Sequence, residues 1–473
     1  MSTTRKIAHN TAVQVIGKAF STLLGLIALG MMTRYLGQEQ FGWYTTTISF
    51  LQFVAILIDF GLVPVTASMM SQAQYDKKQL FKNLLGYRFV TSVIFLGIAP
   101  LVALFFPYPH EVKIAIAFST ISFLAVAMNQ VLIGYYQTQL KMHIPAVGEL
   151  LGRIALIAGL AYGIHTESGF LPIMGAVVVA SVIYTLYLWM MAHRESPAGF
   201  GFDKQIWIDI TKQMWPIAIS IIFNVVYLKG DIVLLSFFSN QIEVGLYGAA
   251  YRVLDVMTQT AMMLMGIMLP LLAYAFSHNQ RKEFRQHFQR SFDAMMALAV
   301  PMMVGTLVLA HPIIRLVAGE EFAESGNILR LLSIAVFGVY LGAVFGHTAV
   351  SIGKQKQTMW IYISNAIITL TGYFIFIPRF GMYGAAWMTI FSELYTGLLL
   401  LIFVSRYTGS KLNFFTFVKI VFCSLVMGAT LIIFNSLHVL WLVILGVLVY
   451  ALFAYSLGIV SKQTLKEILG KNQ

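Results

Sequence analysis

Residues 438–460 read HVLWLVILGVLVYALFAYSLGIV, a stretch that contains no Asp, Glu, Lys or Arg. A hydrocarbon core about 30 Å thick requires about 20 apolar residues in a helix, because each helical residue rises about 1.5 Å. The stretch is long enough to cross a membrane and carries no charge that would oppose insertion. It therefore predicts a transmembrane helix.

Comparable apolar stretches recur along the rest of the chain. They lie at 10–33, 43–70, 84–106, 113–136, 146–164, 170–192, 214–238, 245–275, 292–314, 327–352, 359–377, 382–405 and 414–435. The 473 residues are 59% hydrophobic and only 11% charged, against roughly 25% charged residues in soluble domains. Composition excludes a soluble fold. The sequence predicts an all-α integral membrane protein with about 14 transmembrane helices.

The basic residues fall mainly in alternate connections between the predicted helices. If the N-terminus is cytoplasmic, 22 of the 31 Lys and Arg residues lie on the cytoplasmic side and 5 lie outside. Cytoplasmic loops of membrane proteins accumulate Lys and Arg. The distribution predicts a multi-pass protein of the cytoplasmic (inner) membrane with both termini in the cytoplasm. Since these residues are not gathered on one surface, the net charge of +12 does not indicate a nucleic-acid partner.

Two internal echoes divide the chain into halves. The sequence FGWY at 41–44 is echoed by VGLY at 244–247, and Gly-Ala at 175–176 is echoed at 384–385. Both echoes fall at equivalent places in a period of six spans. Because six is even, both halves begin on the same side of the membrane and would be parallel repeats with a substrate path at their interface.

Three parts are expected from this period. Residues 1–195 form an N-terminal six-helix bundle, residues 196–410 a C-terminal six-helix bundle, and residues 411–473 two extra transmembrane helices with a cytoplasmic tail. The connections between spans are short, so they leave no room for a separate catalytic domain.

Signals of catalytic or metal chemistry are missing from the sequence. The ten histidines show no H-x-x-x-H or His/Cys ligand spacing, so no metal site is expected. The single cysteine, Cys423, cannot form an intrachain disulfide. No Walker-type, Gly-x-Ser-x-Gly or dinucleotide fingerprint occurs. We therefore expect no enzyme and no cofactor, and any active transport would be secondary.

Three segments resemble the polysaccharide transporter family, the Wzx-type oligosaccharide flippases of the multidrug/oligosaccharidyl-lipid/polysaccharide (MOP) exporter superfamily. TRYLGQEQFG at 33–42 looks like the family's Arg-x-Leu-Gly-x-x-x-Phe/Tyr-Gly turn after its first helix. DIVLL at 231–235 runs into VGLYGAAYR at 244–252. IPRFGMYGAA at 377–386 is similar to the family's Pro-x-x-Gly-x-x-Gly-Ala-Ala segment.

This resemblance implies an architecture and a cargo. The architecture is two pseudo-symmetric six-helix bundles around a central cavity, in a MATE-like V. The cargo is a lipid-linked oligosaccharide on a polyprenyl pyrophosphate, which is an O-antigen, capsule or exopolysaccharide repeat unit. A proton or sodium gradient would drive its export. The expected partners are this substrate and membrane lipids, with a functional link to a glycan polymerase and to glycosyltransferases.

Cations inside the predicted spans are candidates for binding an anionic headgroup. An ionisable group at the bilayer centre costs about 2.5–3.5 kcal/mol even on the mildest scale, so it normally faces a cavity or a partner. Lys18 has no acid within a helical turn, and Lys229 lies two residues from Asp231, on the opposite helix face. We take Lys18, Lys229 and Arg252 as headgroup ligands, with Arg88 helping capture at the cytoplasmic mouth. The alternative is that these cations snorkel or bond backbone carbonyls.

Two pairs of charges could neutralise themselves along one helix face. Glu149 lies four residues before Arg153, and Arg252 lies three before Asp255. For Arg252 both a structural and a substrate role remain open.

Three carboxyls in the spans are candidates for ion coupling. A group that binds a proton or sodium must be buried beside changing water access. Asp59, Asp231 and Glu393 fit this requirement by position.

Two other functions share the hydrophobic profile. A multidrug or small-molecule exporter of the same superfamily is the first alternative. A membrane-embedded glycan polymerase or ligase is the second, although the outside link near 311–330 is short for such an enzyme.

Overall fold

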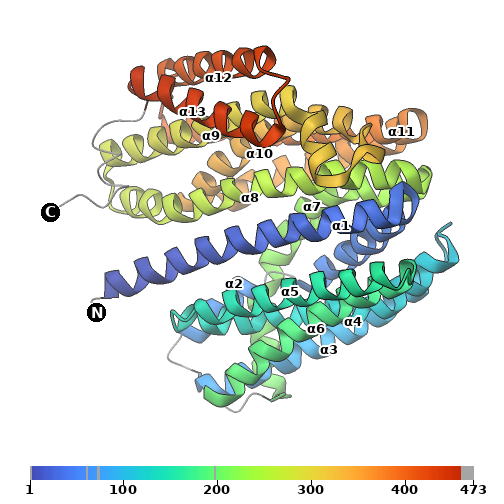
Figure 1. Cartoon of the computed structure of the whole chain (residues 1–473). Coiled ribbons are helices and arrows are strands. Elements are labelled where there is room, and N and C mark those ends of the chain that lie inside the picture. Colours follow the sequence, from blue (N-terminus) through green and yellow to red (C-terminus); the bar gives the residue numbers. More distant parts are fainter. Residues whose placement is uncertain (1–2, 60–61, 72–74, 196–198, 460–473) are drawn as a thin grey trace. The chain divides into compact units, whose positions relative to one another are not determined.

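The computed structural model describes residues 3–59, 62–71, 75–195 and 199–459 (Figure 1). Within these ranges it describes the backbone but not the side chains of residues 3–13, 15, 56–59, 63–64, 67–68, 71 and 215–228. Over these ranges the chain is helical and contains no strand. The helices are α1 (Thr3–Asp59), α2 (Leu62–Ser71), α3 (Lys77–Ala103), α4 (His110–Thr138), α5 (His143–His165), α6 (Phe170–Glu195), α7 (Lys204–Phe238), α8 (Gln241–Ser277), α9 (Arg281–Ala318), η1 (Glu320–Phe322), α10 (Ser325–Ser351), α11 (Gln355–Thr408), α12 (Phe415–Ile433) and α13 (Val439–Ser456). The predicted all-α class is confirmed.

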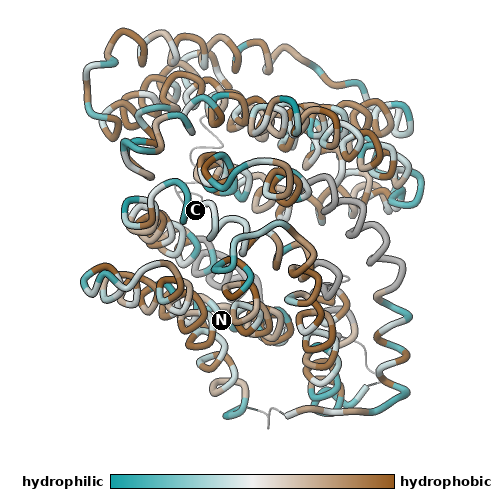
Figure 2. Tube along the Cα trace, turned by 90° about the vertical axis from the view of Figure 1, so that its right-hand side faces the viewer, coloured by the Kyte–Doolittle hydropathy of each residue, from teal (hydrophilic) through white to brown (hydrophobic). Residues whose placement is uncertain are grey.

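Eleven helices in the described residues are long and apolar enough to cross a membrane. The chain is therefore a multi-pass membrane protein. Along the helices, hydrophobic stretches alternate with hydrophilic residues near the turns (Figure 2). The predicted span 214–238 corresponds to α7, much of which lies outside the described side chains.

α11 contains two predicted spans, and α1 contains one together with the first part of the span predicted at 43–70, whose remainder lies in α2. This explains much of the difference between eleven and about 14. α1 is kinked at Gly37, with φ 66° and ψ −175°, and α11 is kinked at Gly381, with φ 54° and ψ −133°. Such positive φ values are accessible to glycine because it has no Cβ. Both glycines belong to the segments that carry the family resemblance, so these segments are the turns between consecutive spans.

The chain divides into two compact units, Met1–Gly245 and Leu246–Gln473. The expected repeat boundary lay at 195/196, before α7. In the structure α7 packs against α1, α2 and α3 and so lies in the first unit. The last two helices, expected as additions, pack on α9 in the second unit.

The core of the first unit is formed mainly by α2, α3, α4 and α6. Phe81 and Leu84 of α3, Tyr136 of α4 and Leu188 of α6 are fully buried in it. Phe81 stacks on Tyr135, with 4.3 Å between ring centroids. Since lipid is as apolar as these side chains, close packing and hydrogen bonds hold such helices together.

In the second unit, α12 and α13 cover one side of α9. Leu309 packs against Met427, Leu431 and Leu442. The hydroxyl of Tyr450 donates a hydrogen bond of 2.9 Å to the carbonyl of Ala297. This packing joins the two C-terminal helices to the unit.

Candidate functional site

A close contact between α1 and α5 places charged side chains together inside the first unit. A Cβ at Gly17 would lie 3.0 Å from the Cβ of Ala146, and one at Gly25 would lie 3.6 Å from Cζ of Arg153. Small residues let membrane helices approach closely. The polar side chains between these two contacts therefore reach across from one helix to the other.

Four of these side chains form a connected cluster. Nζ of Lys18 lies 3.2 Å from Oε1 of Glu149. Oγ of Ser21 donates to the same Oε1 at 2.6 Å, and Nε of Arg153 donates to Oγ of Ser21 at 3.3 Å. We call Lys18, Ser21, Glu149 and Arg153 the α1–α5 cluster.

The cluster corrects two expectations. Lys18 lacks an acid on its own helix but has one on α5. The ion pair of Glu149 among the described side chains is with Lys18, and Arg153 turns to Ser21 instead of neutralising Glu149. The pairing depends on which helix faces meet, and spacing along one helix does not contain that information.

The electrostatics of the α1–α5 cluster favour an anion. Two cations and one carboxylate leave one net positive charge. The side chains of Lys18 and Glu149 are 43% and 26% exposed, although both residues lie on membrane-spanning helices. Because a charge exposed to lipid is costly, this exposed part is expected to face water.

Arg88 lies elsewhere and is only 1% exposed. Its Nε donates to the carbonyl of Ala127 at 3.2 Å, and its Nη2 donates to the side chain of Gln130, both on α4. The side chain thus connects α3 to α4 within the helix packing and does not lie at an open mouth as expected. Capture of a headgroup by Arg88 stays a prediction.

The other candidate cations lie farther along the chain. Arg252 on α8 lies 3.9 Å from Asp255, and the two side chains are 33% and 31% exposed. The predicted pairing of these two residues is confirmed. Lys229 on α7 is partly buried.

The candidate coupling carboxyls are buried where the structure describes them. Asp231 on α7 is fully buried, and its Oδ1 accepts a hydrogen bond of 2.8 Å from the backbone of Ile232. Glu393 on α11 is 6% exposed. The side chain of Asp59 lies outside the described residues. Burial meets one requirement for ion coupling.

Glu393 borders a polar group within the second unit that sequence reasoning missed. Nδ2 of Asn365 donates to the carbonyl of Ser392 at 3.2 Å and to Oγ1 of Thr396 at 2.8 Å. Oγ1 of Thr369 donates to Oδ1 of Asn365 at 2.9 Å. The sequence feature that could have indicated this group is an Asn and several hydroxyl residues within two apolar spans, one on each side of Gly381.

The residues that the structure describes contain no group of three or more His, Cys, Asp or Glu side chains that could hold a metal ion. The charged clusters within the spans are instead pairs of Lys or Arg with a carboxylate.

The sequence of this chain is similar to those of proteins involved in polysaccharide biosynthesis and transport. The family described as polysaccharide biosynthesis protein matches residues 31–327. The succinoglycan biosynthesis transport protein ExoT of Rhizobium meliloti is 21% identical over 77% of this chain and 73% of its own length. A Shigella flexneri protein described as an O-antigen transporter is 21% identical over 80% of this chain and 93% of its own.

Solved structures share the fold. The lipid II flippase MurJ in an inward closed conformation matches with a TM-score of 0.77 and 17% identity, over 94% of this chain and 98% of that one. An inward-facing multidrug resistance MATE family transporter of the MOP superfamily matches with a TM-score of 0.69 and 14% identity, over 82% and 94%. At these identities the likeness establishes the fold alone.

Proposed function

This chain belongs to the polysaccharide biosynthesis protein family, and from that premise we propose that it is a secondary-active flippase for a lipid-linked oligosaccharide. The substrate is a repeat unit of O-antigen, capsule or exopolysaccharide on a polyprenyl pyrophosphate. The protein moves it from the cytoplasmic to the outer leaflet of the cytoplasmic membrane. Relatives described as transporters of succinoglycan and O-antigen support this proposal, as does the fold shared with MurJ.

The observation that carries the proposal is the α1–α5 cluster. A pyrophosphate headgroup cannot enter an apolar path unpaired, because an isolated buried charge costs far more than one that is paired. Lys18 pairs with Glu149, and Arg153 is connected to the same carboxylate through the hydroxyl of Ser21. The two positive charges exceed the single negative charge of Glu149. When the headgroup arrives, Lys18 exchanges its contact with Glu149 for one with phosphate. Lys229 and Arg252 are further headgroup ligands in this proposal.

Energy for transport comes from a proton or sodium gradient. Asp231 and Glu393 are the proposed coupling carboxyls, because each is buried and protonation or sodium binding would neutralise its charge. The cytoplasmic position of both termini follows from the positive-inside rule. The protein carries out no covalent chemistry in this proposal, and it acts before the polymerase and after the glycosyltransferases.

A cellular experiment tests the cargo. The gene is deleted, and lipid-linked glycans on the cytoplasmic side are identified by mass spectrometry. The proposal predicts that one lipid-linked repeat unit accumulates while the matching surface glycan is lost. Wild-type protein restores export, and Glu324→Gln, at an exposed site outside the cluster, restores it equally. Normal surface glycan without accumulation would reject the flippase.

The second candidate function is multidrug export, because the fold is similar to that of a multidrug resistance MATE family transporter. Drug-susceptibility profiling of the same deletion strain separates the two functions. Greater sensitivity to several unrelated drugs with unchanged glycans would favour the exporter.

A further inference from the structure

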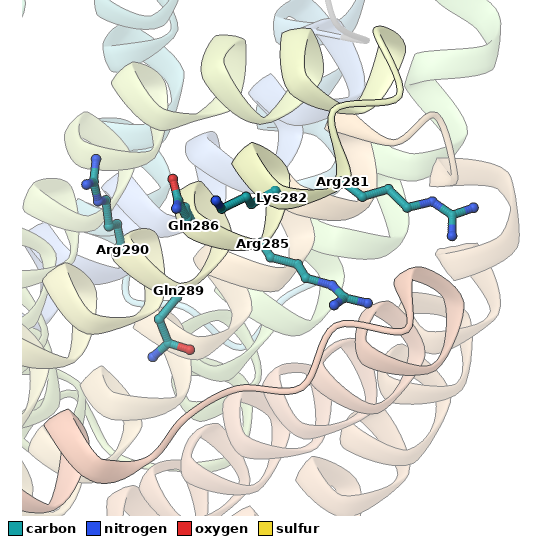
Figure 3. A pocket seen from close by; sticks show the side chains of 6 residues that line it. All are labelled: Arg281, Lys282, Arg285, Gln286, Gln289 and Arg290. Atoms are coloured by element: carbon teal, nitrogen blue, oxygen red, sulfur yellow. The ribbon is translucent and has the colours of Figure 1, made fainter.

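A basic groove lies over the first three turns of α9 in the second unit. It encloses about 640 Å³ and is lined by Arg281, Lys282, Arg285, Gln286, Gln289 and Arg290 (Figure 3). All four cations are exposed. In Figure 3 the side chains of Arg281 and Arg285 extend in the same direction from successive turns of the helix. Arg290 extends away from these two arginines (Figure 3). Four cations therefore line one surface within ten residues of α9, which we call the α9 groove.

Glu283 lies in the same turn as Arg281 and Lys282, but it forms no ion pair with either of them. In the part of the chain that the structure describes, no carboxylate lies within ion-pair distance of Arg281, Lys282, Arg285 or Arg290. Nη2 of Arg285 donates to a backbone carbonyl, that of Gly409, at 3.4 Å. Concentrated positive charge without a counter-ion attracts anions to a concave surface.

The first turns of α9, which carry the cations, are packed against the rest of the second unit. Phe284, Phe288 and Phe292 recur at intervals of four residues along α9, and all three are buried, so the turns that carry the cations are anchored in the unit. Gln289 clamps the α11–α12 connection, because its Nε2 donates to the carbonyl of Asn413 and its Oε1 accepts from the backbone N–H of Asn413, each at 2.9 Å. The groove is thus part of the folded unit.

Apolar rings lie directly beside this clamp. Phe414 and Phe415 follow Asn413 and are 49% and 66% exposed. The ring of Phe414 also contacts that of Phe292 on α9, with centroids 5.7 Å apart. Exposed aromatic rings next to cations at the end of a spanning helix are typical of the membrane–water interface. A ligand for this surface would carry both an anionic group and hydrocarbon.

We propose that the α9 groove binds the phosphate headgroup of an anionic phospholipid that stays in the surrounding bilayer. The cations contact the phosphate, and the acyl chains lie against Phe414 and Phe415. A freely soluble phosphate would use the cations but not the exposed rings. Basic pockets at the cytoplasmic ends of spanning helices have the chemistry to bind such headgroups, at about 1 kcal/mol for each Lys or Arg, which is about fivefold in affinity. The lipid is separate from the transported substrate.

Lipid retention by the purified full-length protein tests this site. The protein is exchanged into detergent containing either phosphatidylcholine alone or phosphatidylcholine with phosphatidylglycerol, and bound lipid is counted by native mass spectrometry. The triple variant Arg281→Gln, Lys282→Gln, Arg285→Gln is expected to bind phosphatidylglycerol about 100-fold more weakly, at about fivefold for each cation. Binding of phosphatidylcholine should be unchanged.

The matched control removes three cations from α3, with Lys77→Gln, Lys78→Gln and Lys82→Gln. It should retain phosphatidylglycerol as the wild type does. Equal losses in both triple variants would overturn the proposal, because they would indicate a general charge effect. Displacement of the lipid by inorganic phosphate in the wild type would also overturn it.

Two further variants keep the test decisive if the triple variant folds poorly. Arg281→Lys with Arg285→Lys retains the charge and should retain the lipid. Lys282→Gln alone should lose about fivefold. Full retention by Lys282→Gln with a normal elution profile, together with loss of lipid by the lysine variant, would contradict the electrostatic basis of the site. None of these variants touches the α1–α5 cluster, so failure here leaves the flippase proposal standing.

Discussion

Nζ of Lys18 on α1 and Oε1 of Glu149 on α5 lie 3.2 Å apart, joining two spanning helices that are 131 residues apart in the chain. A structural ion pair and a binding site predict different consequences for the two partners. If the pair only holds the helices together, loss of either partner is equally harmful. If the cluster binds a pyrophosphate, loss of the cation is worse.

Lys18→Gln should therefore impair export more than Glu149→Gln. The first change lowers the net charge of the α1–α5 cluster from one to zero, and the second raises it to two. We expect about a fivefold loss of export rate for Lys18→Gln, at about 1 kcal/mol for one cation, and a smaller effect for Glu149→Gln. Export is measured at matched protein level in the deletion strain. Equal losses would indicate a purely structural pair.

Arg88→Ala should lower stability more than it lowers export per folded molecule. The change opens a cavity and leaves the Ala127 carbonyl without its donor, at a cost of about 3 kcal/mol. The melting temperature of the purified protein is compared with that of Lys82→Ala, at a less buried site one turn and a half earlier in α3. An unchanged melting temperature with weakened substrate binding would instead support headgroup capture by Arg88.

Gly42→Ala and Gly245→Ala should both destabilise the first unit. A Cβ at Gly42 would lie 1.8 Å from the carbonyl oxygen of Gln241, and one at Gly245 would lie 2.1 Å from that of Gln38. Overpacking of this kind costs about 1–3 kcal/mol. Gly97→Ala is the control, because nothing lies within 4 Å of a Cβ there. Similar melting temperatures for all three variants would show that the backbone at Gly42 and Gly245 leaves room for a side chain.

Asp231→Asn and Glu393→Gln should uncouple export from the ion gradient. A buried carboxyl that takes up a proton or sodium is replaced in each case by an amide of similar shape that cannot. Flipping down a substrate gradient should persist, while acceleration by an imposed gradient should disappear in at least one variant. Glu324→Gln serves as the exposed control. Normal acceleration in both variants would exclude these residues as coupling groups.

The sequence was informative about spans and poor about contacts across helices. Each of the eleven spanning helices among the described residues coincides with a predicted apolar stretch, because insertion into lipid depends on length and composition within one segment. The turn segments at Gly37 and Gly381 were also visible in the sequence, and the backbone is non-helical at both glycines.

The sequence predicted only part of the candidate site, because its contacts join different helices and depend on how these helices pack. Lys18 was identified as a cation that must find a partner, but the partner lies on another helix and depends on how α1 and α5 face each other. Gly17 and Ala146 were the local signal for that contact. The echo of FGWY in VGLY marked Gly42 and Gly245, and the structure gives the reason for a glycine at both, namely backbone that passes too close for a side chain.

Translocation by the purified protein tests the central claim most directly. The protein is reconstituted into liposomes that contain a polyprenyl-pyrophosphate-linked oligosaccharide, and a membrane-impermeant glycosidase reports the fraction of glycan that reaches the outer leaflet. The account predicts faster exposure than in protein-free liposomes, further acceleration by a proton or sodium gradient, and slower exposure with Lys18→Gln. Exposure at the protein-free rate, with a folded protein and either gradient, would contradict it.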